Sequence, residues 1–263
     1  MDKLDYLIKY LLEENKNIDI EEIPKDLKEK QKLYRSLCNV RDAMPISEKY
    51  LEVENEYLQE EIKKRDIVDL KGISSSIVDG STKISLWKGD ITLLKIDCIV
   101  NAANSQGLGC FIPCHKCIDN IIHSTAGVQL RIACNEKMKN IGILKTGEVF
   151  LTKGYNLPAR FVIHTVGPII HNVVTKKKKA ELEKCYINSL KIAKDAGIKN
   201  IAFCCISTGE FRFPKDLASE IAVKAVKKFL KQNEDFFETI IFDVFSDEDY
   251  DIYLEKLGDV YGI

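Results

Sequence analysis

The sequence predicts an α/β domain, with helices on both faces of a largely parallel sheet, preceded by a helical N-terminal segment. After residue 84, strand-like apolar runs alternate with helical stretches, which is the pattern of a layered α/β fold. Before about residue 70 there is no glycine, and apolar residues recur at helical spacing. A chain of 263 residues, 45% of them hydrophobic, is long enough to bury a sizeable core.

We expect residues 1–72 to form an N-terminal helical extension and residues 73–263 to form the main domain. The first helix of the extension is predicted from one apolar face, made of Leu4, Leu7, Ile8, Leu11 and Leu12. Apolar residues among dense charge predict a solvent-exposed amphipathic helix over residues 46–64. Gly, Ser and Asp in residues 72–83 indicate turns and a boundary. A packing role is the simplest expectation for the extension.

The elements of the main domain follow in order along the chain. Strands are predicted at residues 84–87, 98–100, 149–152, 161–165, 201–207 and 239–245. Helices long enough to connect parallel strands are predicted at residues 118–134, 180–196 and 214–230. Ligands of such sheets bind beyond the carboxyl ends of the strands, so the loops that follow strands are the expected site.

Charge and composition exclude several classes of partner. Because 39 basic residues face 40 acidic ones, the net charge of −1 gives no field to hold nucleic acid or an anionic membrane. Charges interrupt the apolar N-terminus, unlike a signal peptide, and the longest uncharged run contains amides that hydrocarbon would not tolerate. The nine cysteines are expected to be reduced, since this chain is too long to need disulfides. We therefore expect a cytoplasmic protein with no nucleic-acid or membrane partner.

The loop at residues 206–214, ISTGEFRFP, follows an apolar run and precedes an amphipathic helix. Ser207 and Thr208 offer hydroxyl groups, and Gly209 allows close backbone approach. The N-terminus of the following helix adds unpaired N–H groups and the positive end of a dipole. Such a loop suits a diphosphate, and a plain turn is the alternative interpretation.

A second loop, NAANSQGLGCFIPCHKC at residues 101–117, carries a denser set of polar groups. Asn101 and Asn104 stand at a strand end, where their amides could hold sugar hydroxyls or simply form an asparagine turn.

The cysteines of this loop are more specific, because thiolate and imidazole are the ligands that zinc prefers. Cys110, His115 and Cys117 can converge on one cation and leave a fourth position open, as in catalytic zinc sites. Cys114 would allow a closed four-ligand set instead, although neighbouring Cys114 and His115 point apart in an extended chain. The metal-free alternative is that the cysteines are small buried apolar groups.

These motifs resemble the macrodomain family, and in particular its zinc-containing class of ADP-ribosyl hydrolases. The resemblance covers residues 84 to about 250, and the extension is similar to the N-terminal region that accompanies this class. It is carried by the segments WKGDIT (87–92), IVNAANS (99–105), LGCFIPCHKCIDNIIHSTAG (108–127), HTVGP (164–168) and CISTGEFRFP (205–214). It implies a three-layer α/β/α fold with a central mixed, largely parallel sheet.

The resemblance also implies roles for individual residues. Asp90 would bind the adenine amino group, with the backbone of Ile91 beside it, and Asn101 and Asn104 would hold the distal ribose. Asn104 and Asp119 would take part in catalysis, and the alternative for Asp119 is a first-turn helix carboxylate. The loop that wraps the diphosphate would consist of Ser207, Thr208, Gly209, Glu210 and Phe211. The zinc ligands would be Cys110, His115 and Cys117.

The activity implied is a zinc-dependent hydrolase that removes ADP-ribose from protein side chains, with one Zn²⁺ per chain. The metal would polarise an oxygen of the substrate or lower the pKa of a bound water. Expected partners are ADP-ribose and an ADP-ribosylated protein, with a lipoyl-carrier protein as one candidate, and the chain is expected to be a monomer. The alternative function is a binding module that reads ADP-ribose without cutting it, with zinc only shaping the loop.

Overall fold

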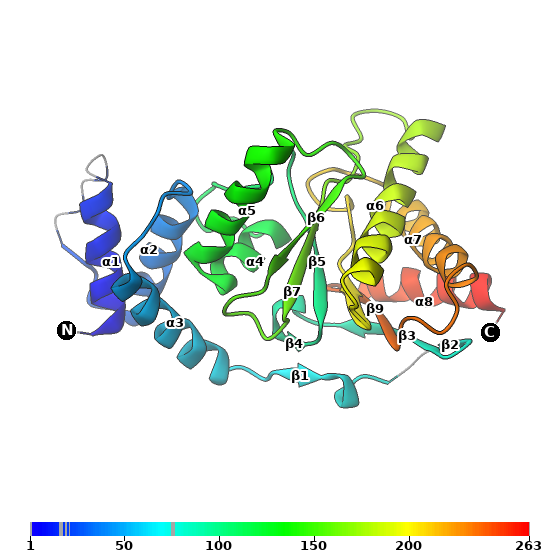
Figure 1. The fold of residues 1–263 in the computed structure, drawn as a ribbon, viewed down its shortest axis with the longest axis horizontal. Coiled ribbons are helices and arrows are strands. Elements are labelled where there is room, and N and C mark those ends of the chain that lie inside the picture. The colour runs from blue at the N-terminus through cyan, green and yellow to red at the C-terminus, as the bar shows by residue number, and fades with distance from the viewer. Residues whose placement is uncertain (1, 16–17, 19, 21, 75–76, 263) are drawn as a thin grey trace.

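A computed structural model describes residues 2–15, 18, 20, 22–74 and 77–262. Within these residues, seven strands form one sheet in the order β2-β3-β9-β8-β5-β7-β6 (Figure 1). Neighbours from β3 to β7 are parallel, whereas β2 and β6 are antiparallel at the two edges. The expected α/β class with a mixed, largely parallel sheet is confirmed. The strands are β1 (Val68–Asp69), β2 (Ile77–Asp79), β3 (Thr82–Lys88), β4 (Leu94–Lys95), β5 (Cys98–Ala102), β6 (Val149–Lys153), β7 (Phe161–Thr165), β8 (Asn200–Phe203) and β9 (Thr239–Val244).

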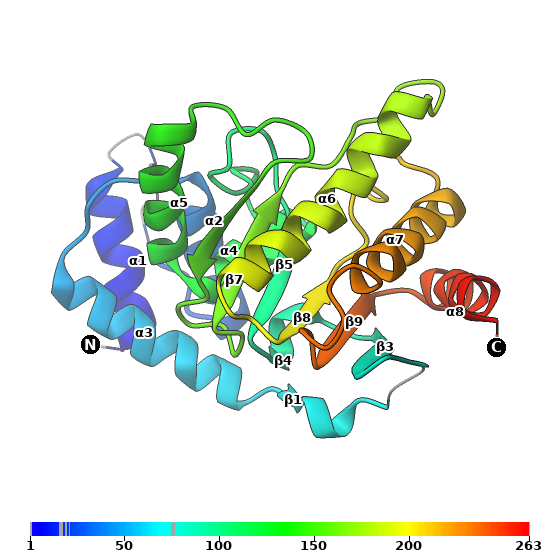
Figure 2. The same cartoon turned by 45° about the vertical axis from the view of Figure 1, so that its right-hand side comes forward.

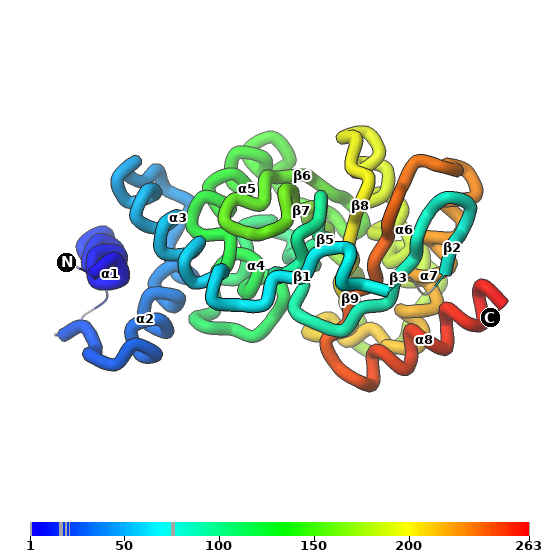
Figure 3. The backbone as a smooth tube through the Cα atoms, turned by 90° about the horizontal axis from the view of Figure 1, so that it is seen from below, coloured from blue at the N-terminus to red at the C-terminus, as the bar shows by residue number. Residues whose placement is uncertain are grey.

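The helices are distributed between the sheet and the N-terminal extension. In the main domain, α6 packs beside α7 and α7 beside α8, while α4 contacts β5 and α5 contacts β6 (Figure 2). The extension lies at one end of the molecule and α8 at the other (Figure 3). The helices are α1 (Lys3–Glu14), α2 (Leu27–Val40), α3 (Glu48–Lys63), α4 (Ile118–Ala126), α5 (Val128–Ile141), α6 (Lys176–Asp195), α7 (Lys215–Leu230) and α8 (Asp247–Tyr261). In this described part of the chain, no helix is long and apolar enough to cross a membrane.

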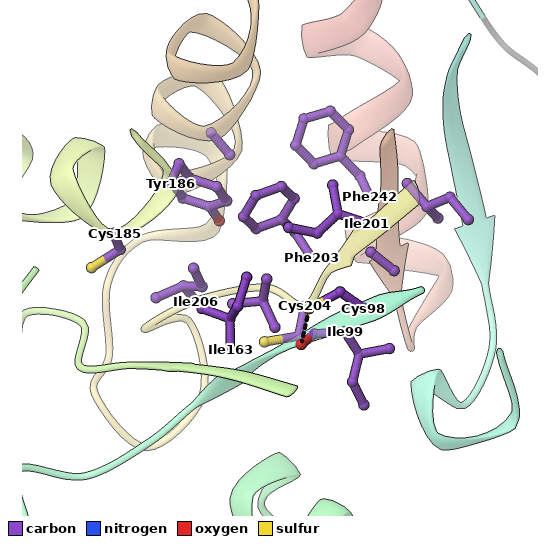
Figure 4. Close-up of a cluster of buried hydrophobic side chains, with 14 of the residues drawn as sticks. Cys98, Ile99, Ile163, Cys185, Tyr186, Ile201, Phe203, Cys204, Ile206 and Phe242 are labelled. Atoms are coloured by element: carbon purple, nitrogen blue, oxygen red, sulfur yellow. Dashed lines mark hydrogen bonds between the residues drawn. The ribbon is translucent and has the colours of Figure 1, made fainter. Parts of the chain in front are cut away.

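The core of the main domain lies between the sheet and its helices. Central strands are buried on both faces, as expected for parallel strands covered by helices. Figure 4 shows Ile99, Ile163 and Ile201 packed with Phe203 and Phe242. Cysteines fill part of this core: Cys98, Cys134, Cys185 and Cys204 are buried and unpaired, and Cys205 is partly exposed.

The extension has its own hydrophobic cluster, which also reaches the main domain. One face of α1 packs against α2 and α3, and Val128 from α5 completes the cluster. The helix expected at residues 46–64 is therefore amphipathic, but its apolar face is buried rather than solvent-exposed. The buried members are Leu4, Leu7, Ile8, Leu11, Tyr34, Leu37, Tyr50, Tyr57, Leu58 and Val128. The expected boundary segment at residues 72–83 contains β2 and its turn into β3, and its residues 75 and 76 lie outside the described part of the chain.

Several element boundaries differ from the sequence prediction. The single helix expected at residues 118–134 is two helices, because Gly127 has φ +89° and a Cβ there would lie 2.7 Å from the carboxylate of Glu54. The strand expected at residues 201–207 ends at Phe203, and Ser207 adopts φ 68° in the loop that follows. Pro214 is the N-cap of α7 rather than its first residue, and α6 begins four residues earlier than expected, capped by Thr175.

Candidate active site and metal-binding cluster

One cavity of about 680 Å³ opens at the carboxyl ends of the parallel strands. Its walls come from the loops after β3, β5, β8 and β9, as expected for ligand sites in sheets of this kind. The loop after β3 contributes Asp90 and Ile91, and the loop after β9 contributes Phe245. A cavity of this volume accommodates a small organic ligand such as a nucleotide. The structure brings most of the candidate site residues to it: Asp90, Ile91, Asn104, Cys110, His115, Cys117, Asp119, Ser207, Thr208, Gly209, Glu210 and Phe211.

Three of these residues form a cluster with metal-ligand geometry. The ligand atoms of Cys110, His115 and Cys117 all lie within 4.8 Å of one another, and Cys110 Sγ is 3.7 Å from His115 Nδ1. Tetrahedral zinc with its usual bond lengths separates sulfur and nitrogen ligands by about 3.5 Å and two sulfurs by about 3.8 Å. The residues present therefore fit a zinc ion.

The electrostatics of Cys117 agree with this fit. Burial, together with the neighbouring Cys110 thiol, raises the pKa of the Cys117 thiol to about 12, against the opposing effect of the hydrogen bond from Asn120 N. Two partly buried thiols side by side both ionise only when a cation compensates their charge. Cys117 is also the N-cap of α4, where its Sγ accepts a 3.4 Å hydrogen bond from Asn120 N. The helix terminus therefore fixes this thiol and favours its negative form.

Cys114 lies outside the cluster, although the sequence left its role open. It has φ 51°, which turns the chain so that its thiol faces α2. Its Sγ is 3.2 Å from Ser36 Oγ and donates to Lys32 O at 3.4 Å. The cluster in this structure thus has three protein ligands and not four.

Asp119 lies at the floor of the cavity, held by amides. Asn101 Nδ2 donates to its Oδ1 at 2.7 Å, and Asn104 Nδ2 lies 3.5 Å from its Oδ2. Burial raises the pKa of Asp119 to about 6, against the opposing effects of the Asn101 hydrogen bond and of Arg131. The sequence places Asn101 beside a bound sugar, whereas the structure gives it no exposed surface and directs its amide towards Asp119.

A second group of possible metal ligands lies behind Asp119, formed by His123, Cys134 and His164. Asn101 Nδ2 lies 3.1 Å from His164 Nδ1, and His164 Nε2 lies 2.9 Å from Thr152 Oγ1. Since the amide nitrogen of Asn101 can only donate, His164 Nδ1 accepts, and the proton of the neutral imidazole is on Nε2. Both ring nitrogens are therefore used in hydrogen bonds and neither is left for a metal. His164 thus makes internal hydrogen bonds, whereas neither nitrogen of buried His123 has a hydrogen-bond partner among the described residues.

The loop at residues 204–213 folds over the other side of the cavity. Thr208 Oγ1 donates to Cys205 O at 3.0 Å, and Phe213 N donates to Ser207 O at 2.9 Å. Gly167 allows this loop to close, because a Cβ at that position would lie 1.9 Å from Ser207 Oγ. The Ser207 hydroxyl is buried and has no hydrogen-bond partner within the part of the chain that the structure describes. Glu210 is exposed, and its Oε1 lies 3.6 Å from His115 Nε2.

Sequence reasoning missed the partner of Asp90 and missed Asp243 altogether. Asp90 accepts from Thr92 through one oxygen and pairs with Arg65, from the end of the extension, through the other. Asp243 lines the cavity with a carboxylate oxygen that has no hydrogen-bond partner, and burial raises its pKa well above the usual range. An aspartate inside the apolar run 239–245 was the available signal, because a buried carboxylate is costly without a purpose.

The fold and the site define a class: α/β proteins with a nucleotide-sized cavity at the carboxyl edge of the sheet, here beside a Cys-His-Cys cluster. The Macro domain family model matches residues 100–222. A "Protein-ADP-ribose hydrolase" of Staphylococcus aureus (strain MRSA252) is 44% identical over 258 residues, which cover 97% of this chain and 95% of that protein. One of Treponema medium is 45% identical over 249 residues, covering 94% and 95%. The chain belongs to the Macro domain family.

Solved structures agree with this assignment. The Oceanobacillus iheyensis macrodomain with ADP is 36% identical and aligns with a TM-score of 0.66, covering 72% of this chain and 98% of that one. The Trypanosoma brucei macrodomain in complex with ADP-ribose is 29% identical and has a TM-score of 0.67, covering 85% and 95%. Both matches are to structures that contain an adenine nucleotide.

Proposed function

We propose that this protein is a zinc-dependent hydrolase that removes ADP-ribose from ADP-ribosylated protein side chains. The observation that carries the proposal is the position of the Cys110, His115 and Cys117 cluster in the wall of the same cavity as Asn104 and Asp119. The names of the relatives, at 44% identity over nearly the whole chain, support the hydrolase activity. The cluster supports membership of the zinc-containing class, with one ion per chain.

The cavity suggests how ADP-ribose is held. In our proposal, Asp90 and the backbone of Ile91 bind the adenine, and the residues 207–211 surround the diphosphate. Asn104 holds the distal ribose, which brings the anomeric carbon towards the cluster. Asn101 acts indirectly, because its amide binds Asp119 and not the cavity. The unpartnered hydroxyl of Ser207 supports the diphosphate assignment, since a phosphate oxygen would supply the missing partner.

The reaction proposed is hydrolysis at the anomeric carbon, through an oxocarbenium-like transition state. A bound zinc ion supplies a Lewis acid that polarises oxygen and favours hydroxide near neutral pH. Asp119 accepts a hydrogen bond from the water or from a ribose hydroxyl and orients it. Asn101 fixes the Asp119 carboxylate for this role, and the low exposure of both side chains excludes competing solvent. The Asn104 amide also holds its own loop in a turn, the alternative considered for it, since its Nδ2 donates to Gly109 O at 3.0 Å and its Oδ1 accepts from Gln106 N at 3.0 Å.

The test is release of free ADP-ribose from a mono-ADP-ribosylated protein, for which a modified lipoyl-carrier protein is a first choice. We expect release by the zinc-loaded protein, loss of release after verified zinc removal, and recovery when zinc is restored. Cys117→Ala should be inactive, and Cys114→Ser is the matched control because its thiol lies outside the cluster. Release without zinc would refute metal dependence, and binding of ADP-ribose without release would establish the reader function instead.

The proposal also includes a division of the chain into an N-terminal extension and a macrodomain. We place the boundary between the extension and the macrodomain near residue 72, because α1–α3 share one hydrophobic cluster and the strands of the large sheet begin after it. The extension reaches the cavity at Asp90 through Arg65. The proposed enzyme therefore comprises both parts.

A further inference from the structure

The C-terminal half of α2 is hydrogen-bonded to the loop that carries the metal-binding cluster, and α2 packs against α4. We propose that this half of α2 positions the three metal ligands, with Arg35 and Asn39 as the positioning residues. This inference rests on the proposed function, because it assigns the extension a role at the proposed zinc site. It differs from a packing role, in which these contacts would only increase stability.

Arg35 joins two parts of the cluster with one guanidinium group. Its Nη2 donates to His115 O at 2.7 Å and to Asn120 Oδ1 at 2.7 Å, and its Nε donates to the same Oδ1 at 3.2 Å. Asn120 in turn binds Ile112 O through Nδ2 at 2.9 Å and the Cys117 thiol through its backbone N–H. One side chain of the extension therefore sets the distance between the backbone of His115 and the helix end that presents Cys117.

Asn39 holds the tip of the loop. Its Oδ1 accepts from Cys114 N at 2.8 Å, and its Nδ2 donates to Ser124 Oγ on α4 at 3.1 Å. Asn39 is 1% exposed, so these bonds are shielded from water. Cys114 has φ 51°, a conformation that non-glycine residues rarely adopt without support. Asn39 supports this conformation, which withdraws the Cys114 thiol from the cluster and leaves three ligands.

Arg131 on α5 ties the end of α2 to the third ligand. Its Nη1 donates to the carbonyl groups of Cys38, Asn39 and Arg41, at 3.0, 2.8 and 2.5 Å. The same guanidinium donates to Leu108 O at 2.8 Å and to Cys110 O at 3.3 Å. A cation suits this place, because the carbonyl groups at a helix C-terminus carry partial negative charge. The backbone on both sides of the cluster is thus bonded to α2 directly or through one shared side chain.

The positioning contacts are separable from the packing of the extension. Arg35 and Asn39 do not belong to the hydrophobic cluster of α1–α3. Gln31, one turn earlier on α2, faces α3 instead, where its Nε2 donates to Glu61 Oε2 at 2.9 Å. Arg35→Ala removes three hydrogen bonds to the loop and α4, Gln31→Ala removes one to α3, and alanine favours the helix in both. Only the first should alter the metal site.

The experiment measures Zn²⁺ affinity of the full chain by competition with a chelator, and the absorption spectrum of the Co²⁺-substituted protein. Loss of a group that orients metal ligands typically weakens metal affinity by about 10–100-fold. We expect a loss in this range for Arg35→Ala and for Asn39→Ala, with altered Co²⁺ bands. We expect wild-type values for Gln31→Ala and partial recovery for Arg35→Lys, which keeps a donor near His115 O. Thermal unfolding of the metal-free proteins checks that all variants fold.

Three results would overturn the inference, and they differ in what they say of the proposed function. If wild-type protein binds Zn²⁺ and releases ADP-ribose while Arg35→Ala and Asn39→Ala match it in affinity and Co²⁺ spectrum, only the positioning role fails. If wild-type protein binds no Zn²⁺, both the positioning role and the zinc-dependent function fail. Equal losses in Gln31→Ala and Arg35→Ala would also refute positioning, because they would reflect general loosening of α2.

Discussion

Glu54 offers a quantitative test of how the extension is joined to the macrodomain. Its side chain is fully buried on α3, where Oε1 accepts from Tyr34 at 2.7 Å and from Tyr50 at 3.3 Å. Oε2 accepts from Val128 N at 3.1 Å, at the start of α5. Burial raises the pKa of Glu54 from 4.5 to about 7, against the opposing effect of these three hydrogen bonds and of Arg41.

The sign of the pH dependence follows from the raised pKa of Glu54. The folded protein binds this proton more tightly than the unfolded chain, so the contribution to stability is fully present below about pH 4.5. It is lost as the pH rises through the folded-state pKa of about 7. At about 1.4 kcal/mol per pKa unit, the whole effect is about 3.5 kcal/mol, and about 2.5 kcal/mol of it falls between about pH 5 and about pH 8.

The assay is urea unfolding of wild-type protein and Glu54→Gln at those two pH values, with the same zinc content. All other titrating groups are common to both proteins, so their effects cancel in the difference between the two free energies of unfolding. We expect wild type to lose about 2.5 kcal/mol relative to the variant on going to the higher pH. A difference that stays constant within about 1 kcal/mol, or that changes in the other direction, would refute the reasoning.

Three further outcomes are expected. Cys117→Ala should lose bound zinc while Cys114→Ser keeps one ion per chain, because only the first thiol belongs to the cluster; elemental analysis decides, and full occupancy in Cys117→Ala would remove it from the ligand set. Gly109→Ala should lower the free energy of unfolding by more than about 1 kcal/mol in a urea titration, because φ is +84° and the new Cβ would lie 2.8 Å from the His123 ring. A free energy of unfolding equal to that of wild type would contradict this. Asp90→Ala should bind ADP-ribose more weakly with unchanged zinc content, and calorimetry showing equal affinity would rule out its adenine role.

Local patterns in the sequence predicted the elements that carry a clear hydrophobic periodicity. The apolar spacing of the first residues predicted α1, and the alternation of strands and helices predicted the sheet. The helix break at Gly127 was missed, although glycine is a common residue at a helix C-terminus. The structure shows why glycine stands there: its φ is +89°, and a Cβ would lie 2.7 Å from the carboxylate of Glu54. The helix α8 was also missed, although Ser246 followed by acidic residues is a helix N-terminal signal.

In the candidate site, too, residue spacing predicted some features, and others depend on contacts between distant parts of the chain. Spacing alone brought Cys110, His115 and Cys117 together as candidates, and the structure places their ligand atoms within reach of one ion. Spacing could not show where the Cys114 thiol points, because its direction depends on Asn39 and on a positive φ. Nor could it reveal Arg35, which is 80 residues from His115 in the chain and meets it only through folding.

In our proposal Asp90 binds the adenine amino group, and its pair with Arg65 would then make that end of the cavity a site of competition. One oxygen of Asp90 is already used by Thr92, so an incoming amino group must share the other oxygen with Arg65 or displace it. The pair is partly exposed, with side-chain exposures of 40% and 25%, and pairs of this kind contribute at most about 1 kcal/mol. Displacement therefore lowers ligand affinity by less than about tenfold, and added salt, by screening the pair, reduces even that loss.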